Sequence, residues 1–140
     1  MSTATAPATA VEKPSVAHLP YRPESASVAR RLVRDKLAEW ELDELIDDAQ
    51  LIVSELAGNA VKTSCLLRMT VEITRITATA VRISVTDGSR TLPVLIDAGL
   101  KAEGGRGLAL VHELTRGQWG ATLEPFGKII HADLRMRGAS

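Results

Sequence analysis

The sequence contains very little of several residue types, and each shortage argues against a class of protein. Its single cysteine, Cys65, cannot form an intrachain disulfide, and a lone cysteine is typical of a reducing compartment. Aromatic residues make up only 3% of the chain, which argues against stacking platforms for nucleic-acid bases. No apolar run approaches the length of a membrane span, and the first residues lack the pattern of a secretion signal. These absences predict a cytoplasmic protein that does not enter membranes.

An excess of charge of one sign is also absent. The 140 residues include 17 Lys and Arg against 17 Asp and Glu, so the formal net charge is zero. Proteins that bind nucleic acid directly, or that lie on anionic membranes, usually carry a basic excess. We therefore expect neither nucleic acid nor a membrane as a partner.

The residues that are abundant fit one packed domain. Hydrophobic residues make up 45% of the chain, and with so few aromatics the core must consist of Val, Leu, Ile and Ala. Residues 1–15 are rich in Ala, Thr and Pro and offer no core face, so we predict a disordered leader there. The folded domain is expected over 16–136, followed by a polar tail over 137–140.

Apolar residues recur with the period of a helix in some stretches and with the period of a strand in others. Ser25 or Ser27 is expected to cap the first helix, whose apolar face begins at Val28, and Asp43 is expected to cap the second. This order of elements predicts an α+β two-layer sandwich, in which helices cover one face of a mixed, mainly antiparallel sheet. In chain order, the expected elements are a strand over 16–21, helices over 25–40 and 43–61, strands over 67–74 and 81–85, a helix over 108–114, and strands over 118–124 and 128–136.

The second predicted helix carries a first candidate site. Glu55 and Asn59 are four residues apart, so they share one side of the helix beside its apolar face. A carboxylate can accept a proton or hold a water, and an amide oxygen can bind a hard cation such as Mg²⁺. The spacing is also compatible with a solvated pair at the helix edge.

A second candidate follows the strand that ends near Val85. Asp87 there can accept a hydrogen bond from the exocyclic amine of a base, and Gly88 leaves room for a flat ring to approach the backbone. Asp-Gly is also a common turn sequence, so a plain turn is the alternative interpretation.

A third candidate opens the third helix with the sequence Glu-Gly-Gly-Arg-Gly-Leu, residues 103–108. Glycines ahead of a helix expose backbone N–H groups that favour anions, and Arg106 adds a forked donor for phosphate. A flexible hinge would use the same residues. A dinucleotide-binding turn is excluded, because Leu110 stands where its third glycine belongs.

The order and separation of the three motifs together resemble the GHKL ATP-binding fold, the fold of gyrase and histidine kinases. Residues 51–61 resemble its N-box, 85–93 its first glycine box and 103–111 its second. The short chain and Trp119-Gly120 before the final strand are most similar to the small anti-sigma-factor serine kinases. The resemblance extends from Leu19 to Met136.

The resemblance implies that the protein binds ATP with Mg²⁺ between the helices and the sheet. Asn59 would be the Mg²⁺ ligand, and Asp87 the acceptor for the adenine amine. Glu55 would be the general base or the residue that positions a water. The cofactor-binding set that it implies is Asn59, Asp87, Gly88, Gly104, Gly105, Arg106, Gly107 and Leu108, with the phosphates held by 105–107.

The implied function is that of an anti-sigma factor. It would sequester a sigma factor and phosphorylate an anti-anti-sigma antagonist of the STAS type, and because relatives are often dimeric a homodimer is an expectation. The sequence departs from the family where Lys62-Thr63 replaces Arg-His and where the first glycine box is short. These departures motivate the alternative of a non-catalytic, nucleotide-sensing interaction module. A scaffold that binds no nucleotide conflicts with three ordered motifs in one chain.

Overall fold

The computed structural model describes residues 15–20, 22–63, 68–87, 103–125 and 127–137, with the backbone alone at 61–63, 68, 87 and 103–107. The elements follow the predicted order of strand, helix, helix, two strands, helix and two strands. They are β1 Ser15–Pro20, α2 Ser25–Glu39, the 3-10 turn η1 Asp43–Leu45, α3 Ile46–Thr63, β2 Arg68–Thr77, β3 Ala80–Asp87, α4 Glu103–Leu114, β4 Trp119–Glu124 and β5 Gly127–Arg135.

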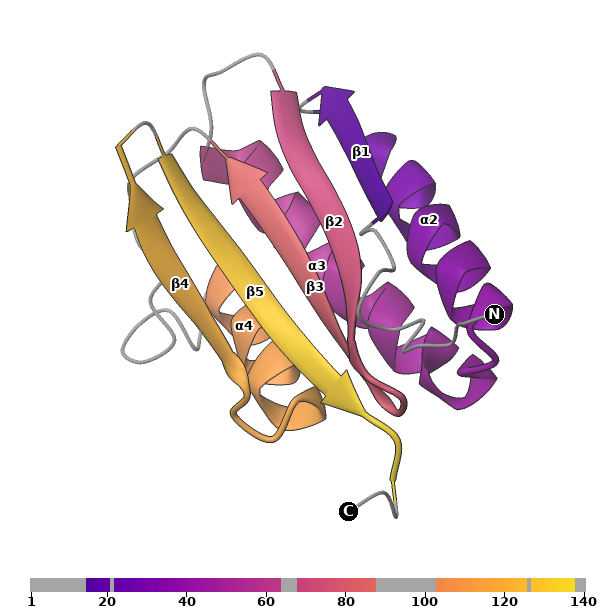
Figure 1. Cartoon of the computed structure of the whole chain (residues 1–140). Coiled ribbons are helices and arrows are strands. Elements are labelled where there is room, and N and C mark those ends of the chain that lie inside the picture. The colour runs from indigo at the N-terminus through magenta and orange to yellow at the C-terminus, as the bar shows by residue number, and fades with distance from the viewer. Residues whose placement is uncertain (1–14, 21, 64–67, 88–102, 126, 138–140) are drawn as a thin grey trace.

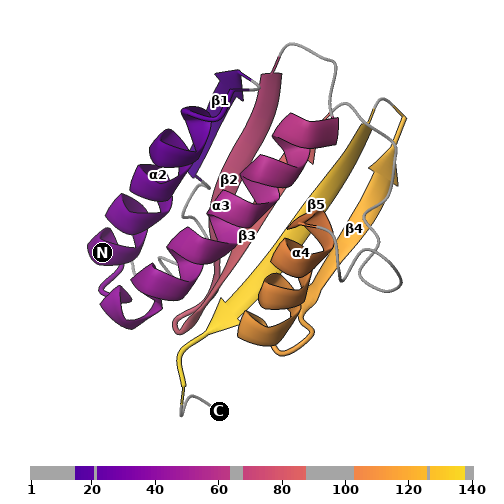
Figure 2. The ribbon, with the colours of Figure 1, turned by 180° about the vertical axis from the view of Figure 1, so that it is seen from behind.

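The five strands form one sheet in the order β1-β2-β3-β5-β4. The three helices cover one face of this sheet, as the two opposite views show (Figures 1 and 2). The predicted α+β two-layer sandwich is therefore confirmed. All four strand pairings are antiparallel, so the expectation of a mixed sheet is wrong for the described residues. The chain crosses from β3 through α4 to the edge strand β4, and β5 then returns beside β3 in the opposite direction.

The core lies between the helices and the sheet. Every second residue of the central strands is buried against the helices, among them Ile83 and Val85 on β3 and Ile130 on β5. Ile52 and Leu56 of α3 cover these strands and are fully buried. Burying one such aliphatic side chain contributes about 1.5–3 kcal/mol, so this aliphatic layer stabilises the position of α3 on the sheet.

The opposite face of the sheet is polar. Arg82 on β3 donates two hydrogen bonds to the Asp133 carboxylate on β5, at 2.7 and 3.0 Å. The hydrogen bond to Asp133 raises the pKa of Arg82 above its usual value. Burial acts in the opposite direction but is the weaker effect. Burial lowers the pKa of the neighbouring His131, and the positive charge of Arg82 lowers it further. An antiparallel sheet that packs helices on only one face commonly has this polar outer surface.

The predicted cap of α2 is wrong. The N-cap position is Glu24, which has helical backbone angles and makes no side-chain capping hydrogen bond. The Ser25 hydroxyl instead donates to the carbonyl oxygen of Pro20 at 2.7 Å and ties the end of β1 to the start of α2. Ser27 accepts a hydrogen bond from the Arg30 guanidinium at 3.1 Å. Asp43 begins the η1 turn, which runs directly into α3 at Ile46.

The apolar face of α2 is also displaced from its predicted position. Val28 is 40% exposed, although the hydrophobic spacing predicted it to begin the buried face. The buried stripe consists of small and aliphatic residues at every fourth position: Ser25, Ala29, Val33 and Leu37. The hydroxyl of Ser25 is satisfied by Pro20, and a satisfied polar group can occupy a core position.

We expect residues 1–14 to be dispensable for folding and for nucleotide binding. Their composition offers no core face, and β1 begins at Ser15, which pairs with Ile73 of β2. A chain that starts at Ser15 should keep the melting temperature and the ATP affinity of the full chain. A chain that starts at Tyr21 lacks β1 and buried Leu19, and should melt at a lower temperature. A large loss of melting temperature or ATP affinity in the chain that starts at Ser15 would show that the leader packs on the domain.

Candidate functional site

The three predicted motifs lie toward the same end of the molecule. α3 lies against both α4 and β3, and its C-terminal half carries the first motif. Asp87 is the last residue of β3, and α4 begins at Glu103 after a connection that lies outside the described residues. Figure 2 shows the last turns of α3, the end of β3 and the first turn of α4 directed toward this end. The sheet thus brings together segments that are well separated along the chain.

Glu55 and Asn59 lie one turn apart at the border of the core. Both are half-buried, whereas their neighbours Leu56 and Ala60 are fully buried. The side-chain oxygen Oδ1 of Asn59 is shielded from solvent. The predicted placement of both residues on one side of the helix, next to the apolar stripe, agrees with this pattern.

A magnesium ion fits this donor set only together with a nucleotide. Mg²⁺ usually takes one or two protein oxygens, and phosphate or water oxygens fill its other positions. No cluster of three or more His, Cys, Asp or Glu side chains among the described residues could hold a metal by itself. The Asn59 oxygen is the kind of single hard ligand that a Mg²⁺–phosphate complex requires.

The second motif is placed by strand pairing. Asp87 pairs with Lys128 of β5, and Val85 two residues earlier pairs with Ile130. Gly88 lies outside the described residues. The strand predicted over 81–85 therefore continues to Asp87, which is its last residue in the structure.

The third motif lies inside α4 and not ahead of it. α4 begins at Glu103, so the three glycines among residues 103–107 belong to its first turns. The first four N–H groups of a helix have no acceptor within the helix, and they therefore remain available to an anion. Leu108 is buried in the core at 3% exposure, so any contact it makes with a ligand involves its backbone.

Lys128 is a residue of this region that the motif analysis did not single out. It is the largest fully buried side chain of the described residues and is 0% exposed. The sequence pattern of the last strand could have identified it. Residues two apart along a strand face the same side, so Lys128 belongs to the same series as the inward-facing Ile130, Ala132 and Leu134. A lysine in this series departs from an otherwise apolar pattern.

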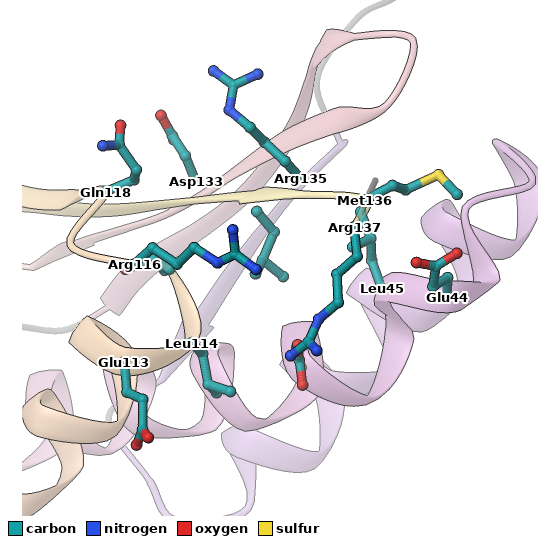
Figure 3. A pocket seen from close by; sticks show the side chains of 13 residues that line it. Glu44, Leu45, Glu113, Leu114, Arg116, Gln118, Asp133, Arg135, Met136 and Arg137 are labelled. Atoms are coloured by element: carbon teal, nitrogen blue, oxygen red, sulfur yellow. The ribbon is translucent and has the colours of Figure 1, made fainter. Parts of the chain in front are cut away.

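A separate hollow of about 600 Å³ lies at the other end of the sheet. Figure 3 shows Arg116, just after α4, and Arg137, just after β5, extending into it, and Glu113 belongs to its lining. Arg116 has a φ of 56°, a left-handed conformation at the end of α4 that precedes Gly117. None of the three motifs contributes to the lining of this hollow, so we do not assign the predicted chemistry to it.

The element order and the three motifs at one end of the sheet define a nucleotide-binding domain of the histidine-kinase type. The chain belongs to the family of histidine kinase-like ATPase domains, whose model matches residues 19–117. This range contains all three motifs, and the predicted relationship is therefore confirmed. Membership of this family implies that the domain binds a nucleotide.

The fold is similar to a solved structure from Mycobacterium tuberculosis. The crystal structure of the RsbU and RsbW domains of Rv1364c matches 89% of this chain with a TM-score of 0.66 and 22% sequence identity. This chain spans only 32% of the length of that chain, and at this identity the likeness concerns the fold. No curated protein matches the chain significantly. Within the described part of the chain, no helix has the length and hydrophobicity that a membrane crossing requires.

Proposed function

We propose that this protein is an ATP-dependent serine/threonine kinase that acts as an anti-sigma factor. It would sequester a sigma factor and phosphorylate a STAS-type anti-anti-sigma antagonist. The observation that supports this proposal best is the placement of Glu55 and Asn59 on α3 beside the end of β3 and the start of α4. This is the arrangement that a nucleotide and its phosphates would need in a domain of this family.

Each motif takes one role in this proposal. Asn59 would hold Mg²⁺, which would supply neutralisation of the phosphate charge, and the first turn of α4 would bind the phosphates through backbone N–H groups. Asp87 accepts a hydrogen bond from the adenine amine. The acceptor hydroxyl of the antagonist attacks the γ-phosphorus, the bond from that phosphorus to the β,γ-bridging oxygen breaks, and ADP leaves. Glu55 takes the hydroxyl proton as general base.

Phosphorylation would act on the antagonist through charge. A phosphate adds nearly two negative charges and three strong acceptor oxygens to its docking surface. That change would break the complex between the antagonist and this protein, which would then be able to hold its sigma factor. Pull-downs from native cytosol with and without ATP would identify both partners.

The alternative function is a non-catalytic module that senses nucleotide through the same site. The replacement of Arg-His by Lys62-Thr63 and the short first glycine box favour it. Radiolabelled ATP with candidate antagonists separates the two functions, because only the kinase transfers label. Calorimetry with Mg-ATP tests what they share: both require saturable heat, and no heat at millimolar ATP would contradict both.

Replacing Asp87 with asparagine should weaken ATP binding by roughly tenfold, because a hydrogen bond to a charged acceptor is replaced by a weaker one. The preference for ATP over GTP should fall with it, since the carboxylate recognises the exocyclic amine. Calorimetric titration of both nucleotides measures the preference. Asp133→Asn is the matched control, because Asp133 lies on the opposite, polar face of the sheet in its pair with Arg82. An unchanged preference in Asp87→Asn would remove Asp87 from this role.

A further inference from the structure

Lys128 is a charged residue in the interior of the fold. It is the second residue of β5 and is 0% exposed, although lysine is almost never fully buried unless it is paired. Along β5 it is followed at every second position by Ile130, Ala132 and Leu134, all of which are buried under the helices. Alternation along the strand therefore places Lys128 on the face of the sheet that the helices cover.

A buried ammonium group requires a compensating acidic group nearby. Removing an ammonium ion from water costs several kcal/mol, which a hydrogen-bonded counterion offsets. The two residues directly across from Lys128 are Leu123 on β4 and Asp87 on β3. Lys128 engages in an interaction within the protein, and Asp87 is the acidic residue that the register places opposite it.

Position 87 also belongs to the covered face. Val81, Ile83 and Val85 of β3 are buried there, and position 87 continues the same series. Residues directly opposite one another in an antiparallel pair have Cβ atoms about 4.5–5.5 Å apart, which is within the reach of a lysine side chain. The pairing of β3 with β5 therefore sets Lys128 opposite the residue proposed for base recognition.

We propose that Lys128 is a positioning residue for the nucleobase, which keeps the Asp87 carboxylate ionised and oriented toward a 6-aminopurine. The inference rests on the proposed nucleotide site and adds to it the residue that determines base selectivity. A carboxylate offers about four lone-pair sites, so it can accept from Lys128 and still accept from the amine of adenine. A neighbouring ammonium group favours the charged form of a carboxylate and donates a hydrogen bond to it, and Lys128→Met removes both effects.

The test compares two nucleotides that differ only in the amine. ATP and purine riboside triphosphate, which carries hydrogen in place of the 6-amino group, are titrated with Mg²⁺ by calorimetry into the full chain and its Lys128→Met variant. We expect the variant to lose at least about tenfold in ATP affinity, because the charge-assisted hydrogen bond from the adenine amine to Asp87 is lost. It should bind the amine-free analogue as the wild type does. Lys128→Arg should retain the preference for ATP.

Three controls separate positioning from a general structural effect. Arg135→Met removes a positive charge from the exposed end of the same strand and should leave both affinities unchanged. Adding Lys128→Met to Asp87→Asn should cause no further loss of the ATP preference, because the two residues act on the same contact. If Lys128→Met alone fails to fold, adding Asp87→Asn should restore folding, since the double variant leaves no uncompensated charge.

The outcomes distinguish this inference from the function on which it rests. Binding of neither nucleotide by the wild type would overturn the proposed function and the inference with it. Binding of ATP by the wild type together with an unchanged ATP preference in Lys128→Met would overturn only the role of Lys128. An equal loss for both nucleotides, or a failure of Asp87→Asn to rescue an unfolded Lys128→Met, would assign Lys128 a purely structural part.

Discussion

Replacing Asn59 with alanine is expected to abolish the detectable binding of Mg-ATP. A Mg²⁺ ligand holds the phosphates in the ground state as well as in the transition state, so its loss appears as lost binding and not only as lost turnover. The Oδ1 atom of Asn59 is shielded from solvent at the border of the core, where alanine offers no oxygen to replace it. Calorimetric titration with ATP at millimolar Mg²⁺ measures the effect.

The control for this substitution is Gln50→Ala on the same helix. Gln50 is also a half-buried amide, but its Nε2 donates to the carbonyl oxygen of Arg30 between α2 and α3. The Gln50→Ala variant should bind Mg-ATP as the wild type does. Removing Mg²⁺ with a chelator should cause the same loss of ATP binding in the wild type as the Asn59→Ala substitution. Wild-type affinity in Asn59→Ala would show that this residue is not the metal ligand.

Replacing Glu55 with alanine is expected to leave ATP binding intact and to slow phosphorylation of the cognate antagonist by on the order of a hundredfold or more. A general base acts when the acceptor hydroxyl attacks, so the defect belongs to turnover. Phosphoryl transfer depends chiefly on positioning and charge neutralisation, and losing the base should therefore cost less than losing the metal ligand. Transfer of radiolabelled phosphate at saturating ATP measures the rate.

Glu44→Ala provides the comparison for Glu55. Glu44 is an exposed carboxylate on η1, at the opposite end of α3, and its loss should change neither binding nor rate. Phosphorylation by Glu55→Ala at the wild-type rate would exclude Glu55 as the base. A wild type that binds ATP and phosphorylates no antagonist would favour the non-catalytic module.

Much of the fold could be predicted because its signals are local. The alternation that includes Ile73 and Ile83 identified β2 and β3, and the turn between them made an antiparallel hairpin the natural connection. The wide apolar face of α3 identified the longest helix. The predictions failed where a tertiary contact overrides a local preference. Ser25 donates to the Pro20 carbonyl oxygen rather than capping α2, and Val28 lies outside the buried stripe.

The sequence by itself determined the chemical groups of the candidate site and the order in which they occur. Glu55 and Asn59 share one side of a helix because their spacing matches its period, and this follows from the chain alone. The glycines of residues 103–107 were recognisable as a helix start, although the helix proves to include them.

Only the tertiary structure decided which distant segments lie side by side. β5 pairs with β3 and leaves β4 at the edge of the sheet, and this pairing sets Lys128 opposite Asp87. Periodicity along a strand specifies which face each residue occupies, but it does not specify which strand will lie next to it. The neighbour is chosen by the crossover through α4 and by the burial of whole faces against the helices, and both are properties of the assembled chain.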